Sequence, residues 1–171
     1  MAEPRVEPAV LPPKGLLLSL LAQAPLVIWA WPPRPAVWEL AAGAALLLAG
    51  AVLNLWAERL LRRSDVGVCP FSPVPRLVSG GPYRVSRNPM YLGMALLSAG
   101  VTLMTGSLAN VWSPVLYIWW IRVAFVLPEE TFLRERLGEE YARYERTRPR
   151  WLGVPRETTD AASAGTVVTP G

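Results

Sequence analysis

A group of side chains able to do chemistry lies between Gly80 and Gly93, where a glycine turn and a basic segment lead into an apolar run. Asn88 and Pro89 open that run, and they are typical of a helix N-cap followed by the first helical position. The first turn of a helix has unpaired N–H groups and a partial positive charge, so it can bind a carboxylate or a phosphate. The residues alone leave a second interpretation open, in which Asn88 only caps the helix while Arg84 and Arg87 only bind anionic lipid headgroups.

Two adjacent carboxylates, Glu129 and Glu130, follow Pro128 at the end of another apolar run. Acidic side chains at the C-terminal end of a helix oppose its dipole, so we expect them to have a cationic partner or a functional role. Arg122 precedes Glu129 by seven residues, which places both on nearly the same face of a regular helix. The spacing therefore predicts a structural pair of Arg122 with Glu129, and it leaves Glu130 to face a pocket.

The residue types limit the possible chemistry. The chain has no histidine and one cysteine among 171 residues. This excludes a disulfide framework, a zinc-finger site and any mechanism that depends on imidazole, so no bound metal is expected. Cys69 lies in a proline-rich segment and is interpreted as incidental, and no residue can be assigned as a catalytic base. The formal net charge of +4 does not by itself indicate nucleic acid, and no such partner is expected.

The elements that position these side chains follow from the distribution of charge. Hydrophobic residues make up 52% of the chain and charged residues only 18%, which indicates that lipid solvates part of the surface. The predicted fold is all-α, a polytopic membrane protein of about four transmembrane helices followed by a C-terminal amphipathic helix. The uncharged runs place the spans at about 15–31, 36–57, 89–104 and 111–127, and the helix at about 129–145.

These elements are expected to form one transmembrane domain, 15–156, between a cytoplasmic N-terminal segment, 1–14, and a disordered tail, 157–171. The connection between the second and third spans carries six arginines and the C-terminal region seven, whereas the first connection has only Arg34 and the third has none. Because positively charged loops stay in the cytoplasm, both termini are predicted to be cytoplasmic, in a prokaryotic inner (plasma) membrane. Two glycine pairs spaced by seven residues, Gly43 with Gly50 and Gly93 with Gly100, predict a close approach of two spans.

The ordered motifs carry a resemblance to a known family. The run from Gly81 to Gly93, then Glu129 with Glu130, and then the segment from Leu137 to Tyr144 resemble the C-terminal core of the integral-membrane methyltransferases. These are the isoprenylcysteine carboxyl methyltransferases and the phospholipid N-methyltransferases, and the similarity covers about 78–151. The resemblance implies an S-adenosylmethionine-dependent methyltransferase that binds its cofactor at the cytoplasmic membrane face, between the last spans and the C-terminal segment.

The resemblance also implies a set of cofactor-contacting residues. Asn88, Pro89, Tyr91 and Gly93 fall in the first cofactor-contacting motif, and Glu129 and Glu130 match the acidic pair of the second. Chemistry adds Arg84 and Arg87, which can bind the cofactor's carboxylate, and Tyr83 and Tyr91, whose aromatic faces can attract its sulfonium.

The acceptor is expected to be membrane-associated or hydrophobic, with a lipid amine, a carboxylate or a thiol as the reacting group. The isoprenylcysteine branch typically has histidine where this chain has Asn88, while the phospholipid branch often has asparagine, which argues against a prenylcysteine acceptor. A membrane lipid and a hydrophobic small molecule are the expected partners.

Two other functions stay open from the sequence. Membrane sterol-type reductases that use NADPH resemble the same C-terminal core, although the short chain fits a methyltransferase better. A non-enzymatic membrane scaffold is the third reading, in which Arg143, Arg146, Arg148 and Arg150 bind anionic lipid.

Overall fold

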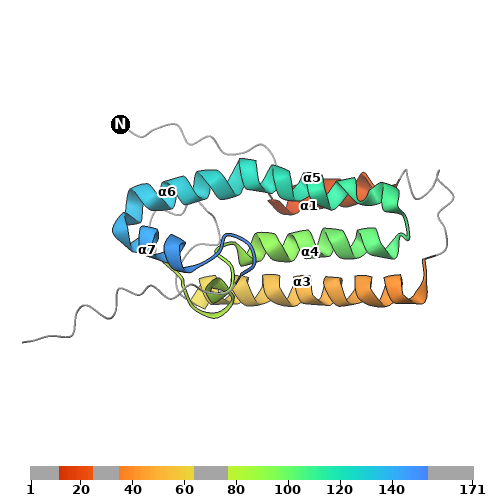
Figure 1. Ribbon diagram of the computed structural model, residues 1–171, viewed down its shortest axis with the longest axis horizontal. Helices are drawn as coiled ribbons and strands as arrows, with labels where there is room; N and C mark the ends of the chain where they lie inside the picture. Colours follow the sequence, from red (N-terminus) through yellow and green to blue (C-terminus); the bar gives the residue numbers. More distant parts are fainter. Residues whose placement is uncertain (1–11, 25–34, 64–76, 154–171) are drawn as a thin grey trace, which may run out of the picture.

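The computed structural model describes residues 12–24, 35–63 and 77–153, and in these ranges the regular elements are all helical. Figure 1 shows α1, α3, α4 and α5 side by side along the long axis of the molecule, with α6 continuing from α5 and α7 folding back at one end. The elements are α1 (Pro12–Leu21), α3 (Val37–Arg63), a 3-10 helix (Gly81–Arg84), α4 (Pro89–Met104), a short 3-10 helix (Leu108–Asn110), α5 (Trp112–Ile121), a π-helix (Arg122–Val126), α6 (Leu127–Leu137) and α7 (Glu139–Thr147). The predicted all-α fold class is confirmed for the described residues.

Among the described residues, α3 is the one helix that is long and apolar enough to cross a membrane, and α4 is a shorter apolar helix. Many large apolar side chains of α3 are exposed, including Trp38 at 65% and Trp56 at 53%. These two tryptophans are 18 residues apart, or about 27 Å along the helix, which is close to the thickness of the hydrocarbon layer of a bilayer. An apolar helix with exposed side chains and tryptophans near its two ends is typical of a membrane span.

The remaining bounds differ in part from those predicted. Helix α4 has the predicted bounds of the third span, whereas α3 continues to Arg63, past the predicted end at 57. Helix α1 has ten residues and rises about 15 Å, half of a hydrocarbon layer, so within the described residues it does not complete the predicted span 15–31. The predicted helix 129–145 is divided at Gly138, whose φ of +54° ends α6 and starts α7. Several predicted segments lie outside the described residues. They are residues 1–11, residues 25–34 of the first span and first connection, residues 64–76 with Cys69, and the predicted tail.

Helices α3 and α4 pack closely at two pairs of glycines. A Cβ atom on Gly50 would lie 2.6 Å from the carbonyl oxygen of Gly93, and one on Gly100 would lie 2.8 Å from that of Gly43. The predicted close approach is therefore confirmed, and it joins the two helices along their length. Gly93, which the resemblance assigned to a cofactor-contacting motif, lies in this helix–helix contact.

This packing predicts that Gly50→Ala lowers thermal stability. The added methyl group would force the backbones of α3 and α4 apart, at a net cost of about 1–2 kcal/mol after the gain in helix propensity. The measurement is the midpoint of thermal unfolding in detergent, followed by tryptophan fluorescence. Gly80→Ala is the matched control, because Gly80 has a φ of −88° and a Cβ atom there would meet nothing within 4 Å. Equal midpoints for the two variants would contradict the packing argument.

Helix α1 is joined to the bundle by a cluster of polar side chains. The hydroxyl of Ser19 lies 3.1 Å from that of Ser98 in α4, and Ser113 of α5 donates to the carbonyl oxygen of Ser19 at 2.9 Å. Thr102 donates to the side-chain oxygen of Gln23 at 3.0 Å. Hydrogen bonds between hydroxyl groups are a common means of association for helices in an apolar environment.

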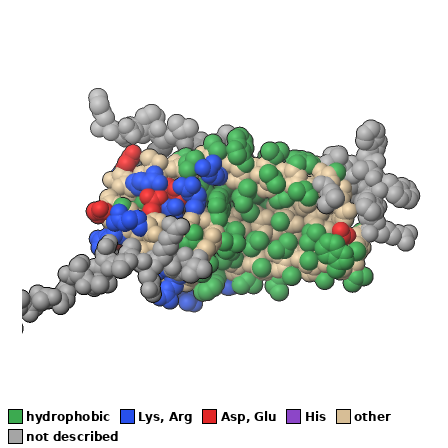
Figure 2. All heavy atoms as spheres, viewed as in Figure 1, with side chains coloured by type: hydrophobic (Ala, Val, Ile, Leu, Met, Phe, Trp, Pro, Cys, Tyr) green, Lys and Arg blue, Asp and Glu red, His purple; other side chains and the backbone are tan. Residues whose placement is uncertain are grey.

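Charge gathers at one end of the molecule. Figure 2 shows hydrophobic side chains over the bundle and most of the basic and acidic side chains at the end that carries α6 and α7. We call this end, formed by residues 80–88, 129–137 and 139–151, the polar cap. It contains the predicted Gly81–Asn88 motif and both predicted carboxylates.

Candidate functional site

The segment before α4 is held by the C-terminal strap, which we define as Arg148–Trp151. The backbone N–H of Arg87 donates to the carbonyl oxygen of Pro149 at 2.9 Å, and the hydroxyl of Ser86 donates to that of Arg150 at 3.3 Å. Asn88 occupies the N-cap position of α4, but its side chain makes no capping hydrogen bond. Its amide instead donates to the carbonyl oxygen of Arg150 at 3.1 Å. The predicted N-cap position of Asn88 is therefore confirmed, but its side chain fastens the strap instead of capping the helix.

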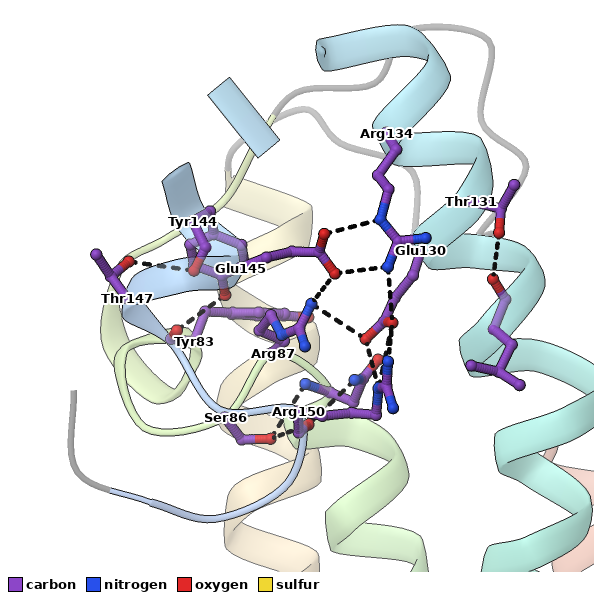
Figure 3. A network of polar contacts seen from close by, with 12 residues as sticks. Tyr83, Ser86, Arg87, Glu130, Thr131, Arg134, Tyr144, Glu145, Thr147 and Arg150 are labelled. Carbon is purple, nitrogen blue, oxygen red and sulfur yellow. Dashed lines mark hydrogen bonds and ion pairs between the residues drawn. The ribbon is translucent and has the colours of Figure 1, made fainter. Parts of the chain in front are cut away.

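The carboxylate of Glu130 lies at the centre of a buried ion-pair network. Glu130 is 2% exposed, and its oxygens lie 2.7 Å from the guanidinium of Arg150, 3.3 Å from that of Arg87 and 3.6 Å from that of Arg134. Glu145 of α7 pairs with Arg87 and, at 2.7 Å, with Arg134 (Figure 3). We call Arg87, Glu130, Arg134, Glu145 and Arg150 the charge network. It joins the start of α4, α6, α7 and the strap into one unit.

The charge network contains three cations and two anions. Glu145 accepts hydrogen bonds from Arg134, and these hold the pKa of the Glu145 carboxyl below its usual value, so Glu145 stays ionised. The Nε atom of Arg87 is buried and has no hydrogen-bond partner among the described residues. A surplus positive charge and an unpaired buried N–H group are suited to a carboxylate or phosphate oxygen.

Glu129 has different surroundings from its neighbour. It is partly buried, and one oxygen of its carboxylate accepts a hydrogen bond of 3.1 Å from the hydroxyl of Tyr91 in α4. No arginine in the described ranges forms an ion pair with it. Burial raises the pKa of the Glu129 carboxyl to about 7; the hydrogen bond from Tyr91 opposes this rise and the charge of Glu130 adds to it. Burial, and then the charge of Glu129, also raises the pKa of Tyr83.

The predicted pair of Arg122 with Glu129 is wrong. Arg122 is exposed and forms no ion pair within the described ranges. The cause is the π-helix Arg122–Val126. A π turn takes one more residue than an α turn, so it displaces all later side chains by one position, about 100° around the axis. Glu129 therefore no longer lies on the same helix face as Arg122. Glu130 does not face a pocket, as predicted, but forms ion pairs in the charge network.

The predicted site residues fall into three groups. The first group is Tyr91 and Glu129, which are hydrogen-bonded to each other, with Tyr83, on which the charge of Glu129 acts. Tyr91 belongs to a core cluster that includes Phe125 and is covered in part by Trp151. Arg87, Asn88 and Glu130 belong to the charge network or fasten the strap, and Pro89 is buried at the start of α4. Arg84 is exposed, and Gly93 contacts α3, so neither joins the first group.

Sequence reasoning missed four members of this region: Ser86, Arg134, Glu145 and the role of Arg150. Arg134 had a local signal, because it follows Glu130 by four residues and such pairs meet on a helix. Arg150 had none, since it is 20 residues from Glu130 and 62 from Asn88. Tyr144 donates to the carbonyl oxygen of Tyr83 at 2.9 Å, whereas the sequence indicated it only as the end of the last segment that carries the resemblance.

One comparison with known proteins identifies a family. A family model described as phospholipid methyltransferase matches residues 38–140, from the start of α3 to the start of α7. The matched range contains the segment before α4 and both carboxylates, and the strap follows it. No curated protein and no solved structure matches the chain. The family match covers more than half of the chain, which therefore belongs to the phospholipid methyltransferase family, whose members are membrane-associated, S-adenosylmethionine-dependent methyltransferases.

Proposed function

We propose that the chain transfers a methyl group from S-adenosylmethionine to the headgroup amine of a membrane phospholipid, in the polar cap. Family membership supports the reaction class. The observation that carries the proposal is the carboxylate of Glu129, which is hydrogen-bonded to Tyr91, has no basic partner among the described residues, and lies in the first turn of α6, directly after the apolar α5 and the π-helix. A phospholipid whose acyl chains lie along the bundle would present its headgroup at this level.

The proposed orientation places the polar cap at the cytoplasmic face of a bilayer. Four spans would cross it: α1 with the residues that follow, α3, α4, and α5 with the π-helix. Exposed arginines gather at this end of the molecule: Arg84, Arg136 and Arg143 belong to the polar cap, and Arg59 and Arg63 lie in the last turns of α3. Positively charged segments near span ends stay cytoplasmic. The exposed apolar side chains of α3 and α5 would contact lipid.

The residues of the polar cap fit the groups that S-adenosylmethionine carries. Arg87 and Arg84 would bind its carboxylate, and the faces of Tyr83 and Tyr91 would lie against its sulfonium. Asn88 and Pro89 would shape the site through the strap and the first turn of α4, and Glu130 would act indirectly by holding Arg87. The cofactor supplies an electrophilic methyl group, and the chain's part is to align it with the acceptor and to exclude water.

The test uses purified protein in lipid nanodiscs with methyl-labelled S-adenosylmethionine. Nanodiscs that contain phosphatidylethanolamine are expected to yield labelled N-methylated lipid, whereas pure phosphatidylcholine, whose nitrogen is already fully methylated, is expected to give none. Binding of S-adenosylhomocysteine is measured by calorimetry in the same preparation. Affinity for NADPH without affinity for S-adenosylhomocysteine would refute the methyltransferase and favour the reductase.

A further inference from the structure

Arg122 lacks the carboxylate partner that the sequence predicts for it. It is the first residue of the π-helix, directly after α5, which contains no charged residue. Its side chain is exposed, and within the described ranges it forms no ion pair. A guanidinium that lies against acyl chains must reach water or an anion, because leaving it in hydrocarbon is costly. The fold of the described residues therefore leaves a cation on an apolar surface without an anion.

The contacts of the neighbouring residues place Arg122 near the end of the apolar bundle that carries the polar cap. Before it in the chain, the hydroxyl of Tyr117 lies 3.4 Å from the sulfur of Met94 in α4. After it, the ring of Phe125 lies 6.3 Å from that of Tyr91, measured between the centroids. Arg122 is therefore level with the first turns of α4, where the predicted third span begins.

A second exposed cation, Lys14 of α1, lies at the same level. On one side of it, the carbonyl oxygen of Pro12 accepts a hydrogen bond of 3.1 Å from Tyr117. On the other side, Gly15 packs against the ring of Trp120. Lys14 also forms no ion pair within the described ranges. Cations at one level of an otherwise apolar surface are typical of the level at which lipid phosphates lie.

The helix face that carries Arg122 suits a molecule with both an anion and apolar chains. Trp119 and Val115 precede Arg122 by three and seven residues, so they lie on the same face of α5, and they are 59% and 57% exposed. Acyl chains can lie along these apolar side chains. The planar guanidinium beside them can donate two parallel hydrogen bonds to phosphate oxygens. A phosphate diester joined to acyl chains matches this face better than a free phosphate ion does.

The π-helix connects this face to the polar cap. It continues directly into α6, whose first turn carries Glu129, seven residues after Arg122. Seven residues correspond to about 10 Å along a helix axis. In an ethanolamine phospholipid a two-carbon link separates the amine from the phosphate. A phosphate bound at Arg122 therefore directs the amine away from the acyl chains and toward the polar cap.

We propose that Arg122 binds the phosphate of the acceptor phospholipid and positions its headgroup at the entrance to the polar cap. The inference rests on the proposed function. Arg122 is a positioning residue, since its guanidinium holds the phosphate and takes no part in transfer of the methyl group. Its loss should therefore weaken binding of the acceptor and leave the chemical step nearly unchanged.

The test replaces Arg122 with glutamine in the full chain. The purified protein is assayed in dodecyl maltoside micelles, which contain no phosphate, with labelled S-adenosylmethionine and a varied mole fraction of phosphatidylethanolamine. The KM for the lipid is expected to rise about tenfold, because a charge-assisted hydrogen bond to the phosphate is lost. The kcat and the dissociation constant of S-adenosylhomocysteine are expected to change less than about twofold.

A second replacement, Arg122→Lys, tests whether the positive charge is what matters. Lysine retains the charge but lacks the planar fork of the guanidinium, so its KM is expected to lie within about threefold of the wild-type value. The unfolding midpoint of both variants is expected to match that of the wild type, because the side chain is exposed. A KM that rises equally in the lysine and glutamine variants would contradict a phosphate contact.

Lys14→Gln is the matched control. It removes one positive charge at the same level of the bundle, but α1 packs against α4 and α5 and does not continue into the polar cap. Its KM for phosphatidylethanolamine is expected to equal that of the wild type. An equal rise of KM in the Lys14 and Arg122 variants would refute the inference, since it would reflect a general attraction of lipid to the basic surface.

Binding measurements separate this inference from the proposed function. Native mass spectrometry is expected to show that the wild type retains more phosphatidylethanolamine than Arg122→Gln does, and equal retention refutes the inference. If the wild type retains the lipid through Arg122 but methylates none of it, the proposed function is refuted and the phosphate contact is supported. Inorganic phosphate is expected not to raise the KM for the lipid. Competition by inorganic phosphate that disappears in Arg122→Gln would assign the contact to free phosphate and overturn the proposal.

Discussion

Replacing Glu130 with glutamine is expected to lower the midpoint of thermal unfolding by about 10 °C. The wild-type carboxylate is 2% exposed and balances three guanidinium groups. A glutamine of the same size would leave those cations with Glu145 as their remaining anion in the charge network. Removing one partner from a buried network costs about 3–5 kcal/mol, because the remaining charges stay buried without compensation. For a chain of this length each 1 kcal/mol corresponds to about 2–4 °C in the midpoint.

The control for this prediction is Glu58→Gln in α3. Glu58 pairs with Arg62 at 2.7 Å, but the side chains are 31% and 68% exposed, so water screens the pair. An ion pair of that kind contributes less than about 1 kcal/mol. Tryptophan fluorescence during heating in one detergent reports both variants. A Glu130 variant that unfolds at the same temperature as the Glu58 variant would show that the charge network does not stabilise the polar cap.

Several features of this fold could be predicted because they depend on local sequence. Pro89 fixes the start of α4, and the glycine turn at Thr105 and Gly106 follows its end, so the predicted bounds 89–104 agree with the structure. Gly43 and Gly50 are seven residues apart, so both lie on one face of the helix, and this face lacks large side chains. That face is the one that approaches α4.

The roles within the acidic pair could not be predicted, because they depend on one π turn. Arithmetic with a regular helix places Arg122 and Glu129 about 20° apart. The π-helix Arg122–Val126 adds one residue to the turn and changes which carboxylate faces which partner. No residue pattern in Arg122–Val126 distinguishes it from an ordinary helical segment.

The strap could not be predicted for a different reason. Its contacts with Arg87 and Asn88 join residues about 62 positions apart in the chain, and most of them use backbone carbonyl oxygens, which any sequence has. The sequence therefore offers a role for the arginine of the strap only in the scaffold alternative, where Arg150 binds anionic lipid by its charge. In the structure Arg150 instead neutralises Glu130 from inside the polar cap.

Replacing Glu129 with glutamine is expected to raise the stability of the protein, whereas the same replacement at Glu130 is expected to lower it. Burial raises the pKa of the Glu129 carboxyl from 4.5 to about 7. Below pH 4.5 the folded and unfolded chains both carry the proton, so the group costs nothing. Between pH 4.5 and about 7 the unfolded chain releases the proton while the folded chain retains it, and the stability of the wild type therefore falls as the pH rises. A glutamine does not titrate, so the stability of the variant does not fall in this way as the pH rises.

The expected difference in unfolding temperature between the Glu129→Gln variant and the wild type is large enough to measure, and it depends on pH. A shift from pKa 4.5 to about 7 corresponds to up to about 3 kcal/mol, so above pH 7 the Glu129→Gln variant should unfold roughly 6–12 °C higher than the wild type. Below pH 4.5 the two proteins should unfold together. All other titrating groups cancel in the difference between them, and Glu135→Gln serves as a control whose difference from the wild type should not vary with pH. A constant difference for the Glu129 variant would mean that its carboxyl is not destabilised by burial. A difference that grows through pH 4.5–7 would show that the fold keeps this carboxyl at a cost, as proteins do where function requires it.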